Sequence, residues 1–107
     1  MNAIIAAQPR DFLYGRAAAL ARPRVSIIVP TYREAENVAP TVAAIERALG
    51  DIAWEIIFVD DDSPDGTVAA VRSLGERDGR VRVIRRVGRR GLAGAVIEGM
   101  MASAADI

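Results

Sequence analysis

The sequence predicts an α/β fold in which three buried strands alternate with three helices in the order β-α-β-α-β-α. Short apolar runs rich in β-branched residues have the length of strands, and the segments between them carry helical periodicity. Strands and helices that alternate in this way form right-handed crossovers and a parallel sheet. A length of 107 residues favours one domain, and the hydrophobic fraction of 51% is typical of a packed chain.

The first strand is expected at "VSIIVP", residues 25–30, a continuous apolar run closed by proline. The helix after it begins at Asn37 or nearer Glu34 and ends at Gly50. Its apolar stripe has the spacing i, i+4, i+7, i+11 and consists of Val38, Val42, Ile45 and Leu49.

The second strand is expected at "WEIIFV", residues 54–59, and the second helix runs from about Pro64 to Gly79. Ser63 followed by Pro64 has the form of a helix cap and first helical position. The alternating run 80–86 predicts a third strand nearer an edge, and residues 92–105 predict a third helix.

Residues 1–24 are read as an irregular extension, with a short helix at 15–22, ahead of a domain over 25–107. Formal net charge is zero, which argues against a nucleic-acid partner. Cysteine and histidine are absent, so acid-base or metal chemistry falls to aspartate and glutamate. No apolar run has the length of a membrane span and no secretory signal is recognisable, so we expect a soluble, cytoplasmic chain, with peripheral membrane contact left open.

Carboxylates gather after the second strand, in "FVDDDSPDGT". In an open parallel sheet, which here would be half of a doubly wound, Rossmann-like nucleotide-binding fold, ligands bind outside the carboxyl ends of the strands. Helix capping explains Asp65 and Asp62, but not Asp60 and Asp61, which precede the cap. Like charges there need hydrogen-bond donors or a cation, and a nucleotide base, a ribose or a divalent ion would supply them.

Two residues after the first strand are further candidates for the same crevice. Tyr32 has a ring that can stack on a base, and the carboxylate of Glu34 can accept a ribose hydroxyl. The simpler alternative for Glu34 is the first turn of a helix, where an acidic residue is ordinary.

A cluster of arginines lies between the third strand and the third helix. A solvated strand edge explains most of its members, and the alternative is a contact of Arg86, Arg89 or Arg90 with a phosphate or an anionic lipid head group. The glycines in "GRRGLAG" do not have the spacing of a dinucleotide site, and close helix packing or a tight turn is the expected role of Gly91 and its neighbours.

Three segments together resemble family 2 glycosyltransferases, and more narrowly the dolichol-phosphate (polyprenol-phosphate) mannosyltransferases. They are "VSIIVPTYREAENV", "EIIFVDDDSPDGT" and "VRVIRRVGRRGLAGAVIEGM". The resemblance covers about four-fifths of the chain. It implies the Rossmann-like half of a GT-A fold, truncated here before the fourth strand.

The resemblance implies transfer of mannose from GDP-mannose to a polyprenyl phosphate, with inversion, at the cytoplasm or the cytoplasmic face of a membrane. It places six residues at the nucleotide, with Asp60 as a supporting neighbour: Pro30, Tyr32, Glu34, Val59, Asp60 and Asp61. Mg²⁺ or Mn²⁺ would be held by an Asp-x-Asp motif after the fourth strand, which this chain lacks, and no catalytic residue is assigned. We therefore expect the donor-nucleotide part of a transferase, inactive alone. Arg33 stands where asparagine is common in the family.

Three alternatives accompany this interpretation. A different nucleotide sugar, such as a UDP-linked one, would keep the enzyme class, whereas a non-catalytic Rossmann-type nucleotide-binding module would not. A response-regulator-like domain is disfavoured because its acidic pair follows the first strand, while its phosphoacceptor follows a third strand that here leads into arginine and glycine.

Overall fold

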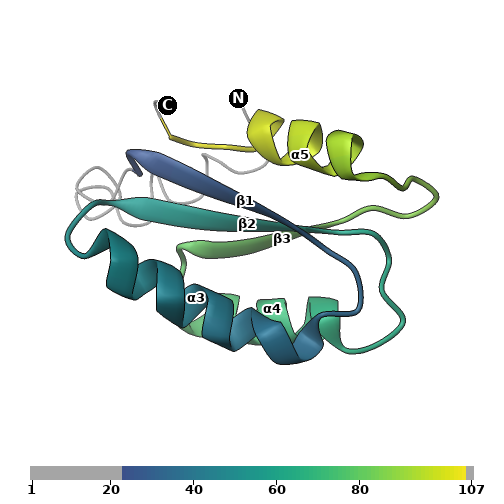
Figure 1. The fold of residues 1–107 in the computed structure, drawn as a ribbon, viewed down its shortest axis with the longest axis horizontal. Coiled ribbons are helices and arrows are strands. Elements are labelled where there is room, and N and C mark those ends of the chain that lie inside the picture. Colours follow the sequence, from purple (N-terminus) through teal and green to yellow (C-terminus); the bar gives the residue numbers. More distant parts are fainter. Residues whose placement is uncertain (1–22, 106–107) are drawn as a thin grey trace.

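The computed structural model describes residues 23–105, and Figure 1 shows their fold. The elements in chain order are β1 (Val25–Thr31), α3 (Ala35–Leu49), β2 (Trp54–Asp60), α4 (Thr67–Arg77), β3 (Val81–Arg85) and α5 (Leu92–Met101). Both strand pairings are parallel, and the sheet order is β1-β2-β3. The predicted element order and parallel sheet are confirmed.

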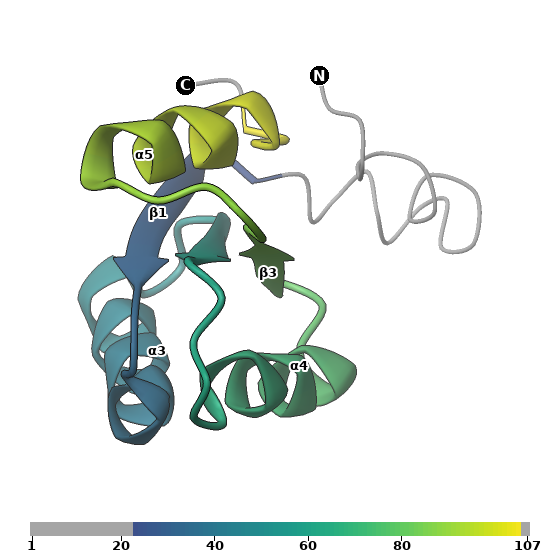
Figure 2. The same ribbon diagram turned by 90° about the vertical axis from the view of Figure 1, so that its right-hand side faces the viewer.

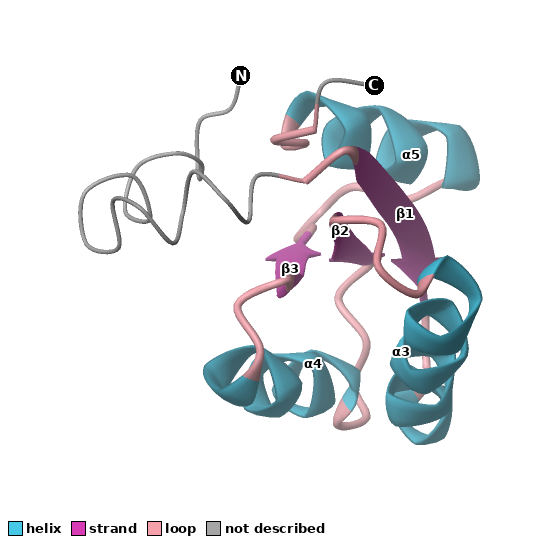
Figure 3. Ribbon diagram, turned by 90° about the vertical axis from the view of Figure 1, so that its left-hand side faces the viewer, coloured by secondary structure: helices cyan, strands magenta, loops and turns pink. Residues whose placement is uncertain are grey.

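Helices cover both faces of the sheet: α3 and α4 lie on one face and α5 on the other, as Figures 2 and 3 show from opposite sides. Every residue of β2 is buried, because β1 and β3 flank it and helices cover it above and below. The continuous apolar run of this strand follows from that position. The core on the α3 and α4 face is the larger and is built around Trp54, Ile56, Phe58, Val38 and Val71. The core under α5 contains Ile57, Val59, Ala95 and Ala102.

Close packing of α5 on the sheet depends on Gly99. A β-carbon added there would lie 2.3 Å from Cγ2 of Ile28 and 3.0 Å from Cγ2 of Val59. Real side chains do not approach so closely, so the helix can reach β1 and β2 only with glycine at this position. This confirms the expectation that glycines in this segment allow close helix packing.

Several predicted boundaries need correction. The second helix begins at Thr67, not at Pro64, and Ser63 does not cap it. The Ser63 hydroxyl donates instead to Asp60, as described below. The third helix ends at Met101, before the predicted 105, because the chain then turns back to the sheet. The short helix predicted at 15–22 lies outside the described residues.

A polar cluster fixes the chain that follows α5 at the amino end of the sheet. Glu55 is 5% exposed. It accepts hydrogen bonds from the Arg82 guanidinium at 2.6 Å, from the backbone N–H of Ala104 at 2.7 Å and from the Ser26 hydroxyl. Arg82 also donates to the carbonyl of Ala102 at 2.9 Å. Sequence patterning gave no signal for this cluster, because Glu55 stands inside an apolar run.

Within residues 23–105 there is no helix with the length and apolarity to span a membrane.

Candidate nucleotide site at the carboxyl end of the sheet

The strands place their carboxyl ends side by side. Thr31 at the end of β1 pairs with Asp60 at the end of β2, which in turn pairs with Arg85 at the end of β3. The backbone N–H of Asp61 donates to the Thr31 carbonyl at 3.1 Å, and that of Arg86 donates to the Asp60 carbonyl at 2.7 Å. The three connections to α3, α4 and α5 therefore leave the sheet at the same end, on the right in Figure 1. The predicted meeting of the "TYRE" and "DDDS" loops is confirmed.

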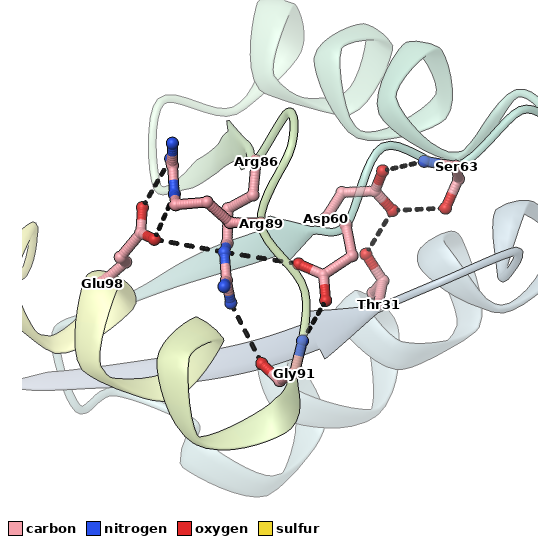
Figure 4. Close-up of polar contacts among 8 residues, drawn as sticks. Thr31, Asp60, Ser63, Arg86, Arg89, Gly91 and Glu98 are labelled. Atoms are coloured by element: carbon pink, nitrogen blue, oxygen red, sulfur yellow. Dashed lines mark hydrogen bonds and ion pairs between the residues drawn. The ribbon is translucent and has the colours of Figure 1, made fainter.

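Asp60 is the buried centre of these loops and has no exposed surface. Its carboxylate accepts hydrogen bonds from the Thr31 hydroxyl at 2.8 Å, the Ser63 N–H at 2.7 Å and the Ser63 hydroxyl at 2.7 Å (Figure 4). These hydrogen bonds join the end of β1 to the turn before α4 through one buried side chain. The geometry fits a supporting role for Asp60. Its complete burial leaves no surface of this side chain for a ligand.

Val59 and Pro30 lie opposite each other in the register of β1 and β2. The Val59 side chain is fully buried in the core under α5, so this side chain is closed to a ligand at the carboxyl end of the sheet. The alternation of the strand points this side chain at the helix. Pro30 is half-buried within β1.

Asp61 lies between β2 and the loop that leads into α5. Its Oδ2 accepts the backbone N–H of Gly91 at 3.1 Å, and its Oδ1 lies 3.5 Å from Nε of Arg86. Oδ1 and that Nε are both buried without a hydrogen-bond partner, although their charges attract. The Asp61 side chain keeps 17% exposure while Oδ1 is buried, so a ligand at this edge of the sheet would meet Oδ2 rather than Oδ1.

Arg86 is buried, contrary to the expectation of a solvated edge or a phosphate contact. It is 3% exposed, donates to the Gly91 carbonyl at 3.1 Å and lies 3.1 Å from a carboxylate oxygen of Glu98 (Figure 4). A β-carbon on Gly94 would lie 2.9 Å from its guanidinium, so glycine there makes room for it. Arg86 thus fastens the β3–α5 loop to α5.

Glu98 on α5 also pairs with Arg89, which donates to it at 3.0 and 3.2 Å. The hydrogen bond from Arg89, together with the charges of Arg89 and Arg86, lowers the pKa of Glu98 and outweighs partial burial. The same hydrogen bond raises the pKa of Arg89. Both arginines are therefore committed to a carboxylate.

The remaining aspartates of the run serve the loop. Asp62 forms an exposed pair with Arg85, with Oδ1 2.8 Å from Nε. Asp65 accepts the backbone N–H of Thr67 at 3.0 Å and so satisfies a free donor at the start of α4. The hydrogen bond from the Thr67 hydroxyl is the main reason that the pKa of Asp65 is lowered. Asp65 therefore lies ahead of α4 and not in its first turn as expected, although it does accept an N–H at the helix start. Asp62 forms a surface ion pair and caps no helix.

Tyr32 and Glu34 present exposed groups at this end of the sheet. Tyr32 is 40% exposed, and the guanidinium carbons of Arg33 and Arg90 each lie 5.4 Å from its ring centre. The exposed Glu34 carboxylate has a long contact of 3.4 Å with the Asn37 amide, and its backbone N–H donates to the Thr67 hydroxyl at 3.0 Å. The structure therefore gathers Tyr32, Glu34 and Asp61 at one edge, as predicted.

Three contributors to this edge escaped the sequence reading: Thr31, Ser63 and Gly91. Thr31 and Ser63 hold Asp60, and the Ser63 hydroxyl also accepts the backbone N–H of Arg33 at 2.8 Å. A threonine and a serine beside an aspartate run are the available signal, but the Ser-Pro pair favours a helix cap at Ser63 instead. No group of three carboxylates within residues 23–105 is arranged to hold a metal ion, because each aspartate of the run faces a different partner.

Comparisons with known proteins agree with this geometry. The family model for glycosyl transferase family 2 matches residues 26–107. A dolichol-phosphate mannosyltransferase from Pyrococcus furiosus is 42% identical over 78% of this chain and 24% of its own length. A polyprenol monophosphomannose synthase from Mycolicibacterium smegmatis is 39% identical over 79% of this chain and 32% of its own.

A solved structure shares the fold: mannosyltransferase PcManGT from Pyrobaculum calidifontis, in complex with GDP-Man and Mn²⁺. It is 34% identical with a TM-score of 0.58, over 74% of this chain and 24% of that protein. The described residues therefore correspond to part of a GT-A fold, and the present sequence spans less than a third of each of these relatives. The chain belongs to glycosyl transferase family 2.

Proposed function

We propose that this chain supplies the donor-nucleotide site of an enzyme that transfers mannose from GDP-mannose to a polyprenyl phosphate. The relatives named above act in this chemistry or bind this donor. The observation that carries the proposal is the placement of Tyr32, Glu34 and Asp61 together at the carboxyl end of a parallel sheet. Open α/β sheets bind nucleotides at this edge.

Each of these residues has a distinct task. Tyr32 offers a half-exposed ring on which a base can stack. Glu34 has an exposed carboxylate that can accept a ribose hydroxyl, and Asp61 can accept base N–H groups at Oδ2. Guanine presents two such donors on one edge, which suits a carboxylate.

A divalent ion belongs to the proposal, but the described residues do not fit one. Mn²⁺ accompanies GDP-Man in the Pyrobaculum enzyme. In the present chain Asp60 is enclosed by three donors and Asp62 is paired with Arg85. We therefore assign the Mg²⁺ or Mn²⁺ ligands to residues outside the described range 23–105, in the form of the Asp-x-Asp motif that the family resemblance implies.

The acceptor is proposed to be a polyprenyl phosphate at the cytoplasmic face of a membrane. A phosphate monoester is ionised at neutral pH and is itself nucleophilic, so the chain need not supply a general base. Peripheral membrane contact of the complete enzyme follows from such an acceptor.

Nucleotide titration tests the donor site. Calorimetry with GDP, UDP and NADH should show preference for GDP. The variant Asp61→Asn should weaken GDP binding about tenfold, because a charge-assisted hydrogen bond to the base is lost. Asp62→Asn makes the same change one residue later, at a surface ion pair, and should leave binding unchanged.

Other outcomes would redirect the assignment. UDP preference would move it to another nucleotide sugar, and NADH preference to a dehydrogenase-like binding module. If Asp61→Asn and Asp62→Asn weaken GDP binding equally, Asp61 does not contact the base.

A further inference from the structure

Arg90 differs from the other arginines that follow β3. It is exposed in the loop before α5, and its guanidinium lies over the Tyr32 ring at 5.4 Å from the ring centre. Its neighbours in the cluster are paired with carboxylates: Arg85 with Asp62, Arg89 with Glu98, and Arg86 with both Asp61 and Glu98. Within residues 23–105, no carboxylate forms an ion pair with Arg90.

The charges around the crevice call for such a cation. Asp61 and Glu34 place carboxylates at this edge, and a nucleoside diphosphate carries several negative charges of its own. Like charges at short distance would oppose binding unless positive groups lie near the phosphates. Among the cluster's arginines in the described part of the chain, Arg90 is the one whose charge is not already balanced.

Arginine is also suited to the task chemically. A guanidinium matches a phosphate with two parallel hydrogen bonds. The contact of Arg90 with Tyr32 holds the side chain at this edge without an ion pair to any carboxylate of residues 23–105. The guanidinium can therefore turn to a ligand without leaving one of these carboxylates uncompensated.

We propose that Arg90 contacts the diphosphate of the nucleotide that binds beside Tyr32. This rests on the proposed function and adds a residue that sets the preference for a phosphorylated ligand. Because the Arg90 guanidinium lies 5.4 Å from the Tyr32 ring centre, the phosphates of a nucleotide bound at this ring would lie near a long, exposed and flexible cation.

The test compares GDP with guanosine on the full 107-residue chain by calorimetry. Arg90→Gln should weaken GDP binding about tenfold and leave guanosine binding unchanged. Arg89→Gln removes the same charge from the adjacent residue, which is paired with Glu98, and should change GDP binding less than twofold. The GDP advantage over guanosine should also shrink as salt is raised.

The outcomes separate this inference from the proposed function. If the unaltered chain binds neither ligand, both fail. If it binds GDP and guanosine equally, if Arg90→Gln binds GDP like the unaltered chain, or if it loses both ligands equally, the Arg90 assignment alone is wrong. An equal loss for Arg89→Gln would also overturn it, because general charge rather than a specific contact would then be responsible.

Discussion

At the scale of single residues, Arg33 has a backbone conformation that most side chains avoid. Its φ of 57° lies in the left-handed region, where a β-carbon crowds the following carbonyl at a cost of roughly 1–2 kcal/mol. Asparagine tolerates this region better. The structure thereby gives a reason why asparagine is common in the family at this position.

Arg33→Asn should therefore raise the free energy of unfolding by about 0.5–1 kcal/mol. Urea unfolding can be followed by fluorescence of Trp54, the only tryptophan in the chain and 1% exposed. Arg33→Ala removes the same side chain but keeps the β-carbon without asparagine's local hydrogen bonds, so it should show no gain. Equal stabilisation by both substitutions would mean that the arginine charge, not the backbone, is responsible.

The sequence singled out the carboxylates after β2 but could not assign their roles. Their order along the chain does not reveal which is enclosed, because β2 is buried on both faces and its alternation carries no polarity signal. Asp60 became the buried centre only because Thr31 and Ser63, from two loops, reach it. The partners of Asp61 come from about 25 to 30 residues further along, at Arg86 and Gly91, and no local pattern indicates them.

At the scale of elements, the close packing of α5 on the sheet depends on the glycine at position 99. Gly99→Ala should lower the free energy of unfolding by about 1–3 kcal/mol, because the new methyl group would overlap Ile28 and Val59. Urea midpoints measure the change. Gly79→Ala is the matched control, since a β-carbon there meets nothing within 4 Å, and it should be nearly neutral. A neutral Gly99→Ala would show that α5 can lift from the sheet at little cost.

The periodicity of apolar residues correctly predicted which helices and strands form. Proline and capping patterns were less reliable guides to the course and the ends of the helices. In α3 the apolar stripe prevails over Pro40, which lies inside the helix, because burial of Val38 and Val42 outweighs the lost hydrogen bond. Before α4 the Ser-Pro pair resembled a helix start, but Asp60 takes both the N–H and the hydroxyl of Ser63. The helix therefore begins four residues later than Ser63, at Thr67.

At the scale of the whole molecule, one arginine joins several elements at the amino end of the sheet. Arg80 donates to Asp78 at 2.8 and 2.9 Å and to Glu46 on α3 at 3.1 Å. Its guanidinium also lies 3.8 Å from the ring centre of Trp54 on β2. The hydrogen bond from the Arg80 side chain, followed by that from its backbone N–H, lowers the pKa of Asp78 despite partial burial.

This contact makes stability depend on pH. A carboxyl whose pKa is lower in the folded state stabilises the fold above its ordinary pKa, here 3.8, and loses that contribution as pH falls below it. Asp78→Asn should thus be less stable than the unaltered chain at neutral pH, and the difference should fade below about pH 4. Urea unfolding at a series of pH values measures it, with Asp51→Asn at an exposed turn as control. A difference that persists at low pH would assign the loss to packing.

The overall architecture was predictable because independent sequence patterns favour the same fold. The apolar runs of buried strands, the apolar stripes of helices and the glycines in loops all favour one parallel sheet. The internal arrangement of the arginine cluster was not. Arg86 is enclosed because Gly94 leaves space for its guanidinium and Glu98 on α5 faces it, a packing solution that alternation in "RVRVIRR" does not encode.

The enclosure of Asp60 bears on how tightly a nucleotide can be held. One buried carboxylate joins the end of β1 to the turn before α4, so the loops at this edge of the sheet are held together by folding itself. The proposed nucleotide would meet loops that are already ordered, and little of its binding free energy would be lost to immobilising backbone. Weakening that anchor would loosen these loops and reduce affinity from a distance, without removing any atom that the ligand touches.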